Sequence, residues 1–187
     1  LLERVGIGGM AEVFVARAQG VAAFSRAVVV KRMLPQLTSD PDSVAMFLDE
    51  ARLGAKLQHA NIVSVVDLGE ADGDYFMVLE YVDGADLAVL LSRARARGRP
   101  VPVAHSAYIV SKVAQGLHFA HLAKDPETRA PLGVVHRDVS PSNILISRTG
   151  DVKVADFGVA RSNMQSVKTA TGAVKGKLAY MSPEQLT

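Results

Sequence analysis

Apolar residues follow strand-like patterns in four stretches of the first part of the chain. Residues 12–17 and 27–31 are rich in valine and alternate or run apolar, as β-strands do. Two further apolar stretches, 62–68 and 75–81, flank the turn-forming residues 71–74 (Ala-Asp-Gly-Asp), which predicts a hairpin. We therefore expect the first third of the chain to be rich in β-sheet.

Helical spacing of apolar residues appears between these strand pairs and again after them. Asp40 is followed by a proline and then by apolar residues every three or four positions, which predicts a capped helix over 41–57. The same spacing predicts helices over 85–97, with Gly98 as C-cap, and over 103–122. The middle of the chain is thus expected to be mainly helical.

Short strands return near the end, at 144–146 and 152–155, across a Thr-Gly-Asp turn. This order of elements predicts an α+β fold. We expect two lobes that meet near residue 82, the first formed by residues 1–82 and the second by residues 83–187.

Composition narrows the class of protein further. The chain has 187 residues, of which 49% are hydrophobic and 21% charged, so it can bury a core and is not disordered. It has no cysteine, which excludes disulfide scaffolds, thiolate zinc sites and cysteine nucleophiles, and fits a cytoplasmic location. A net charge of +2 gives no reason to expect a nucleic-acid partner. No apolar run reaches the ~18 residues of a membrane span, so we expect no membrane contact within this stretch.

The earliest candidate for chemistry is a glycine-rich run that ends at Val13. Gly6, Gly8 and Gly9 would let backbone N–H groups approach phosphate oxygens. A dinucleotide-binding fold would need a helix directly after the glycines, whereas here a strand follows, and the next strand carries Lys31 rather than an acid. We favour a hairpin folded over phosphates, and a glycine turn without a ligand remains the alternative.

Two charged residues extend this site. Lys31 closes the stretch 27–31 and could act as a point charge for phosphates. Glu50 lies within the predicted helix 41–57, where it could pair with Lys31. Taken singly, each also fits an ordinary surface charge.

The densest cluster of polar residues is the sequence HRDVSPSN at 136–143, followed by DFG at 156–158. Asp138 could take a hydroxyl proton, while Asn143 and Asp156 form an oxygen-rich corner. Mg²⁺ prefers such carboxylate and amide oxygens. The two motifs, each flanked by a predicted strand, indicate a site for phosphate chemistry.

Together these motifs resemble those of bacterial, eukaryotic-like serine/threonine protein kinases. The residues of HRDVSPSN and of GKLAYMSPEQ are most similar to those of myxobacterial kinases. The resemblance runs from Val5 to Glu184, with Ser182-Pro183-Glu184 where the family has Ala-Pro-Glu. It implies a two-lobed fold with a small antiparallel-sheet N-lobe and an incomplete helical C-lobe. It also implies transfer of the γ-phosphoryl group of ATP to Ser/Thr hydroxyls of protein substrates, including autophosphorylation, with Mg²⁺.

The resemblance implies a role for each matching residue. Asp138 would orient the substrate hydroxyl, Asn143 and Asp156 would bind Mg²⁺, and Lys31, paired with Glu50, would hold the α- and β-phosphates. Leu79 would be the gatekeeper beside the adenine. The remaining nucleotide contacts would be the loop residues Val5, Gly6, Gly8, Gly9, Ala11 and Val13, the hinge residues Glu80 and Val82, and Asp86 at the ribose.

Three positions depart from the family pattern. Ala11 replaces the third glycine of the loop, a small change that should leave the loop usable. Ser140 stands where the family usually has Lys, and Lys177 stands where it usually has Thr. We hypothesise that these two have been exchanged, so that both act in catalysis, with hydroxyl and ammonium arriving from opposite sides. The alternative is drift with low activity, which leaves a nucleotide-binding pseudokinase scaffold as the competing function.

Two further expectations concern regulation. Thr169 and Thr171 lie between DFG and SPE, where related kinases autophosphorylate, and Arg137 could receive the phosphate. Unmodified loop hydroxyls are the alternative.

The connection 121–133 is longer than the family's usual one, and its Pro, Gly and charged residues predict an exposed loop. Tolerance of an insertion and a docking role are both possible readings of it. The resemblance also implies more helices after Glu184, so we expect the chain to be a piece of a longer one. We expect these 187 residues alone to be poorly stable.

Overall fold

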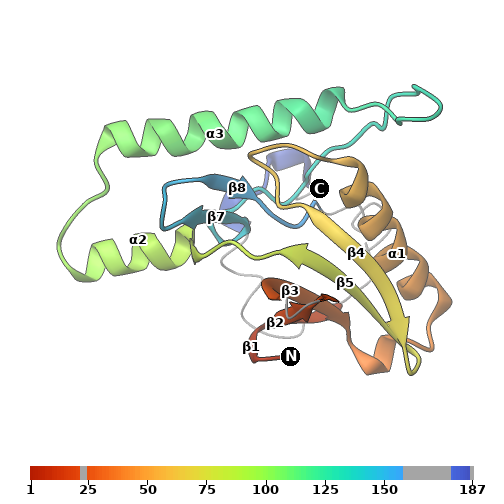
Figure 1. Ribbon diagram of the computed structural model, residues 1–187. Helices are drawn as coiled ribbons and strands as arrows, with labels where there is room; N and C mark the ends of the chain where they lie inside the picture. The colour runs from red at the N-terminus through yellow and green to blue at the C-terminus, as the bar shows by residue number, and fades with distance from the viewer. Residues whose placement is uncertain (22–24, 158–177, 186–187) are drawn as a thin grey trace.

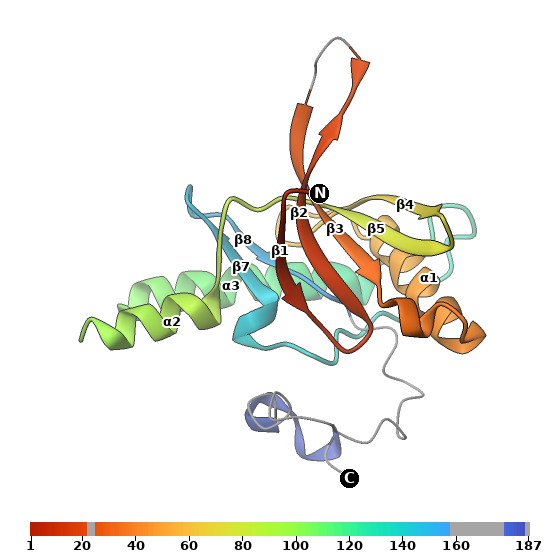
Figure 2. The same cartoon turned by 90° about the horizontal axis from the view of Figure 1, so that it is seen from below.

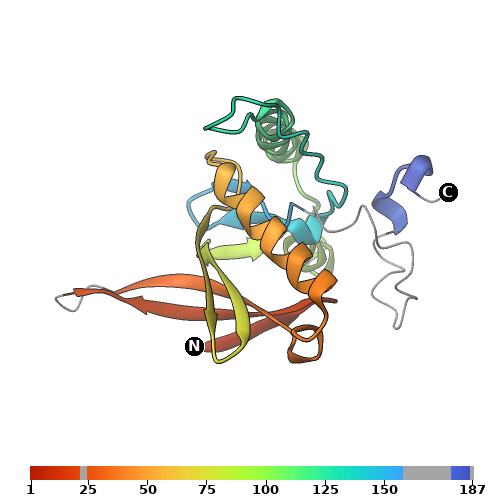
Figure 3. The same ribbon diagram turned by 90° about the vertical axis from the view of Figure 1, so that its right-hand side faces the viewer.

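The computed structural model describes residues 1–21, 25–157 and 178–185 and places them in two antiparallel sheets with three α-helices (Figure 1). The first sheet has five strands in the order β1-β2-β3-β5-β4. Their bounds are Glu3–Ile7 (β1), Ala11–Gln19 (β2), Ser25–Met33 (β3), Val65–Ala71 (β4) and Asp74–Glu80 (β5). The hairpin of β2 and β3 extends away from the rest of the molecule (Figures 2 and 3).

The β4–β5 hairpin has the predicted turn. Ala71 pairs with Asp74, and the two residues between them, Asp72 and Gly73, have φ angles of 55° and 81°. Positive φ at both central positions defines the primed two-residue turn, whose twist matches that of the strands. The Asp-Gly pair therefore sets the register that brings β5 beside β3.

Helix α1 (Pro41–Lys56) covers one face of this sheet. It begins as predicted, because the Asp40 side chain accepts a hydrogen bond from the Ser43 backbone N–H, at 3.2 Å. Its apolar side buries Phe47 and Ala51 in a cluster with sheet residues that include Met33 and Met77. This packing fixes the helix that carries Glu50 against the strand that carries Lys31.

The second part of the molecule contains α2 (Leu87–Ala96), α3 (Val103–Leu122) and a three-stranded sheet in the order β6-β7-β8. These strands are Gly84–Asp86 (β6), Ile144–Ser147 (β7) and Val152–Val154 (β8). Helix α3 packs on β8 and approaches the 59–61 segment closely: a Cβ on Gly116 would lie 2.7 Å from the Asn61 carbonyl oxygen. A residue without a side chain is therefore required there.

A core cluster joins the two parts. Leu57 and Ile62, which follow α1, are buried with Val113 of α3 and with Val154 and Phe157 near β8. Backbone hydrogen bonds run beside this cluster, from Val63 N to Val154 O and from Val154 N to Asn61 O, both at 2.9 Å. The segment between α1 and β4 thus belongs to the core of the helical part.

Some predicted boundaries were wrong. Strand β4 begins at Val65, because Ile62 packs into the core shared with α3 and Val63 N donates to Val154 O instead of joining the first sheet. Strands β1 and β6 were missed, since β1 is mostly exposed and β6 has three residues. Helix α2 begins at Leu87 because Asp86 caps it, accepting from the Val89 backbone N–H at 2.8 Å. Strand β3 runs on to Met33, so the lysine predicted to close it lies inside it.

Within the described part of the chain, no helix combines the length and apolar character needed to cross a bilayer.

Candidate active site

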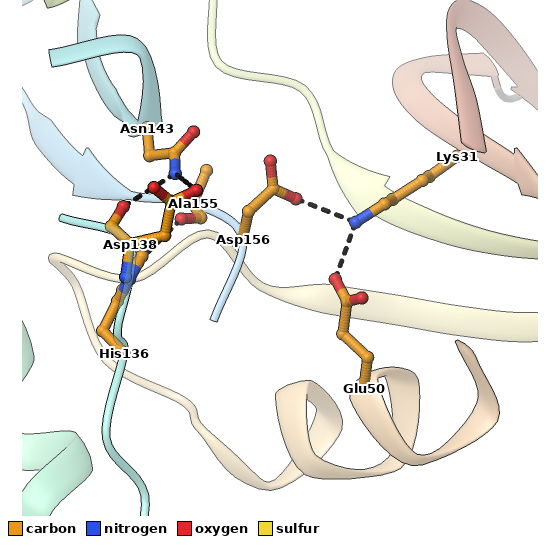
Figure 4. A network of polar contacts seen from close by, with 7 residues as sticks. All are labelled: Lys31, Glu50, His136, Asp138, Asn143, Ala155 and Asp156. Atoms are coloured by element: carbon orange, nitrogen blue, oxygen red, sulfur yellow. Dashed lines mark hydrogen bonds and ion pairs between the residues drawn. The ribbon is translucent and has the colours of Figure 1, made fainter. Parts of the chain in front are cut away.

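Lys31 lies at the centre of a charged network (Figure 4). In β3 it pairs with Val13 on one side and Met77 on the other, so two strands hold its backbone. Its Nζ donates to Glu50 Oε1 at 2.6 Å and to Asp156 Oδ1 at 3.0 Å. The structure therefore joins the two halves of the chain through one ammonium group.

Burial and charge oppose each other at this lysine. Burial disfavours the charged form, but the attraction of Asp156 and Glu50 outweighs it, so the pKa of Lys31 lies above its ordinary value. The Lys31 and Glu50 side chains are each 15% exposed, whereas Asp156 is 51% exposed. Lys31 thus stays charged at neutral pH. Its contact with Asp156 lies on the more exposed side of the site, and its contact with Glu50 on the more buried side.

Asp138 and Asn143 form the second half of the site. Asn143 Nδ2 donates to the Asp138 carbonyl at 2.8 Å and to Asp138 Oδ2 at 3.0 Å. The short 3₁₀ turn of residues 141–143 carries Asn143, whose backbone N–H donates to Ser140 O at 2.9 Å. These bonds hold the Asp138 side chain in a defined orientation. In Figure 4, Asp156 lies between this pair and Lys31.

A buried histidine fixes the backbone around Asp138. The Asp138 N–H donates to His136 Nδ1 at 3.2 Å, so Nε2 carries the ring proton and donates to the Ala155 carbonyl at 3.0 Å. Burial lowers the pKa of His136, which keeps this neutral tautomer. The ring also contacts Phe157, with 4.6 Å between centroids. His136 thereby connects the segment before Asp138 to the residues that flank Asp156.

Both segments contain strained backbone. Arg137 and Asp156 have φ angles of 62° and 56°, in the left-handed region that residues with a side chain rarely adopt. Such conformations cost about 1–3 kcal/mol each and persist only where the surroundings impose them. The strained conformation of Arg137 orients the carboxylate of Asp138, which is the next residue. The strained conformation of Asp156 orients its own carboxylate.

The glycine-rich run forms the turn between β1 and β2, where Gly8 N donates to Ala11 O at 2.7 Å. None of Gly6, Gly8 and Gly9 has a positive φ, so the turn does not need glycine for its conformation. A Cβ at Gly6 or Gly9 would meet nothing within 4 Å. The missing side chains therefore leave open space beside the loop, as a phosphate-covering loop needs. Val5 is exposed, Val13 half-buried and Ala11 fully buried.

The predicted hinge lies at the end of β5, where Glu80 is the last residue of the strand. The Glu80 N–H donates to Ser64 O at 3.0 Å, and the adenine contacts expected of Glu80 and Val82 stay a prediction. The Glu80 carboxylate accepts from Lys153 Nζ at 2.8 Å, so the side chain faces β8. Leu79 lines a cavity of ≈ 30 Å³ that Glu50, Asp156 and Phe157 also line, and its role as gatekeeper stays a prediction.

The donor set suits Mg²⁺ held together with a nucleotide. Asn143 Nδ2 is directed at Asp138, so its Oδ1 is the amide atom suited to a metal, and the Asp156 carboxylate is the second candidate donor. Among the described residues, no group of three or more His, Cys, Asp or Glu could hold a metal by itself. Mg²⁺ commonly uses one or two carboxylates and completes its shell with phosphate oxygens and water. The residues present therefore fit a metal that arrives with ATP.

Several predicted residues are placed differently or not described. The Ser140 hydroxyl is buried and shares a hydrogen bond with Ser142 Oγ at 3.0 Å. Lys177, Thr169 and Thr171 lie outside the described residues, as does Gly158. The exchange hypothesis and the phosphorylation sites therefore remain predictions.

Sequence reasoning assigned no role to His136 or Lys153, although both fix elements of the site. His136 is the first residue of the HRDVSPSN motif, so the sequence could have indicated that it belongs to the site. Its hydrogen-bond partners depend on the tertiary fold and could not be predicted. Lys153 alternates with buried valines in a short strand, and nothing in that pattern identifies Glu80 as its partner.

The chain belongs to the protein kinase family: the family model described as "Protein kinase domain" matches residues 1–187. It is 49% identical to the tyrosine-protein kinase MasK of Myxococcus xanthus and 40% identical to the serine/threonine-protein kinase PknB of Mycobacterium leprae. These alignments cover 99% and 97% of this chain but 28% and 27% of the two relatives.

Among solved structures, the kinase domain of Mycobacterium tuberculosis PknI is similar, with a TM-score of 0.64 and 30% identity. That alignment covers 84% of this chain and 58% of the PknI chain. The expected two-lobed kinase fold is thereby confirmed.

Proposed function

We propose that the chain carries the catalytic site of an ATP- and Mg²⁺-dependent protein serine/threonine kinase. The observation that carries the proposal is the convergence in Figure 4: Lys31 contacts both Glu50 and Asp156, next to the bonded pair Asp138 and Asn143. These five residues come from distant parts of the sequence. Their assembly into one polar site is what phosphoryl transfer requires of a protein, namely positioning and charge stabilisation.

Each residue has a role in this proposal. Lys31, oriented by Glu50, would hold the α- and β-phosphates, while Asn143 and Asp156 would hold Mg²⁺, which would supply positive charge beside the phosphates. The Asp138 carboxylate, oriented by Asn143, accepts a hydrogen bond from the substrate hydroxyl and takes its proton as the hydroxyl oxygen bonds to the γ-phosphorus of ATP. The bond from that phosphorus to the oxygen of the β-phosphate breaks, and ADP leaves. The glycine-rich loop covers the phosphates and excludes water. The carbonyl of Glu80 and the backbone of Val82 position adenine, and Asp86 reaches the ribose.

The acceptor residue has two candidates. Most relatives that the comparison returns are named serine/threonine kinases, among them PrkC of Bacillus subtilis at 35% identity, which supports serine and threonine. The 49% identical relative is named a tyrosine-protein kinase, and this favours tyrosine as the second candidate. The chain spans about a quarter of the length of these relatives, so its protein substrates are also part of the proposal.

Phosphoamino-acid analysis decides between the two. The full chain is incubated with γ-labelled ATP, Mg²⁺ and a mixture of Ser-, Thr- and Tyr-containing peptides, with Asp138→Asn as control. We expect label in phosphoserine and phosphothreonine, and none with the control. Label confined to phosphotyrosine would overturn the serine/threonine assignment, and equal label in the control would overturn the kinase proposal.

A pseudokinase scaffold is not favoured, because the residues for metal, phosphate and base are all present, with Lys31 bonded to Asp156 and Asn143 bonded to Asp138 in the same region. The exchange of Ser140 and Lys177 is tested in the same assay. Lys177→Ala should lower transfer, and unchanged transfer would refute the exchange. Intact-mass analysis after incubation with Mg·ATP tests Thr169 and Thr171, which we propose as autophosphorylation sites.

A further inference from the structure

The long connection after α3 is a small ordered hairpin. Lys124 and Pro131 form an antiparallel bridge. The Asp125 backbone N–H donates to Ala130 O at 2.8 Å, and the Asp125 carbonyl accepts from the Arg129 N–H at 3.0 Å. Most of its residues are exposed, as predicted. The Asp125 side chain is the exception, with 16% exposure. We call residues 124–131 the connecting hairpin.

Asp125 uses its two carboxylate oxygens for different tasks. Oδ1 accepts from the backbone N–H groups of Glu127 and Thr128, at 3.0 and 2.9 Å, and so shapes the hairpin. Oδ2 accepts from Lys56 Nζ at 2.6 Å. The Lys56 ammonium, followed by the hairpin amides, holds the pKa of Asp125 well below its usual range. The carboxylate is therefore charged whenever the protein is near neutral pH.

Lys56 is the last residue of α1, the helix that carries Glu50. Lys56 lies six positions after Glu50, which is about 9 Å along a helix axis. The connecting hairpin lies beside this end of α1 (Figure 3). Among the described residues, the other ion pairs of α1 are Lys31–Glu50, to the first sheet, and Arg52–Asp49, within the helix. The Lys56–Asp125 pair is thus the ionic contact from α1 to the helical part.

The hairpin is in turn anchored to the segment that leads to Asp138. Leu132 N donates to Ala123 O at 2.9 Å, and Leu132 packs against the core that buries Val134. His136, with its two hydrogen bonds, follows two residues later. A continuous chain of contacts therefore runs from the catalytic segment through the connecting hairpin to the end of α1.

We infer that the connecting hairpin positions Glu50 for its contact with Lys31, with Asp125 and Lys56 as positioning residues that hold the end of α1. The inference rests on the proposed function, because Glu50 matters through Lys31. The helix is packed on the first sheet at Phe47 and Ala51, nearer its middle. Leu53 and Leu57 pack into the core shared with α3 at this end, and the Lys56–Asp125 pair adds a polar contact there that limits rotation of the helix and withdrawal of Glu50.

Kinetics of variants in the full chain test this. Lys56→Met removes the ion pair and keeps the side-chain length, Lys56→Arg keeps the charge, and Arg52→Met removes the exposed pair on the same helix as a matched control. We expect Lys56→Met to lower kcat/KM for ATP by about 2- to 5-fold, with Lys56→Arg restoring it and Arg52→Met having no effect. In a Glu50→Gln background, Lys56→Met should have no further effect, because the positioned group is already lost.

Two kinetic results would overturn the inference: kcat/KM unchanged in Lys56→Met, or an equal loss from Lys56→Met in the Glu50→Gln background. Hydrogen–deuterium exchange separates this test from the proposed function, since it needs no activity. Backbone amides of 41–56 should exchange faster in Lys56→Met than in Arg52→Met, even if the wild type transfers no phosphate. Equal exchange in the two variants would also overturn the inference.

Discussion

Replacing Glu50 tests how much the lysine–glutamate contact contributes. Lys31 Nζ and Glu50 Oε1 are 2.6 Å apart, and both side chains are 15% exposed, so water screens the pair only weakly. A hydrogen bond between charged groups contributes about 1.5–3 kcal/mol. Asp156 remains as a second partner of Lys31 at 3.0 Å, so the lysine stays charged in the variants, but its Nζ is no longer held from the helix side.

Each ~1.4 kcal/mol of lost transition-state stabilisation lowers the rate about tenfold. Glu50→Gln keeps a hydrogen-bond acceptor and loses the charge, so it should fall near the lower limit, at roughly 10-fold in kcat/KM for ATP. Glu50→Ala loses both and should fall by roughly 100-fold. Steady-state kinetics of peptide phosphorylation at varied ATP concentration measure both values.

Asp49→Asn is the matched control, because Asp49 is the neighbouring carboxylate on the same helix, 63% exposed and paired with exposed Arg52. It should leave kcat/KM unchanged. The reasoning is refuted if Glu50→Ala stays within about twofold of the wild type, or if Asp49→Asn loses as much as Glu50→Gln.

Two further predictions concern stability. Gly116→Val places a side chain against the Asn61 carbonyl and should lower the free energy of unfolding by about 1–3 kcal/mol. Ala114→Val, on the exposed side of α3, should change it less, and thermal melts compare the two variants. Burial keeps the pKa of His136 below 6.5, so below pH 6.5 the unfolded chain binds a proton that the folded chain does not. The free energy of unfolding should therefore fall as pH drops through this range, and urea titrations of His136→Gln should show a flatter dependence; an equal slope would contradict the lowered pKa of His136.

Local signals in the sequence predicted much of the fold. The Asp40 cap, the Asp-Gly turn after β4 and the apolar spacing of α3 each act over a few residues, and the structure has each of them. Residues 62–64 were misplaced because a buried strand and a buried irregular segment have the same apolar composition. Only the packing of Ile62 under α3 distinguishes them.

The sequence predicted the residues of the candidate site and the Lys31–Glu50 pair, but not the other connections among them. Motif spacing identified Lys31, Asp138, Asn143 and Asp156, and the structure places them in one region. The ion pair of Lys31 with Asp156 spans 125 positions, however, and that of Lys56 with Asp125 spans 69. Such pairs follow from the packing of whole elements, which no local pattern encodes.

The central claim is that Asp138 receives the substrate proton in a site that binds Mg·ATP through other residues. The direct test measures γ-phosphoryl transfer and ATP binding side by side in the wild type and in Asp138→Asn. We predict a loss of transfer of at least about 100-fold, with the ATP dissociation constant unchanged within about threefold. Transfer by Asp138→Asn at the wild-type rate would contradict the account.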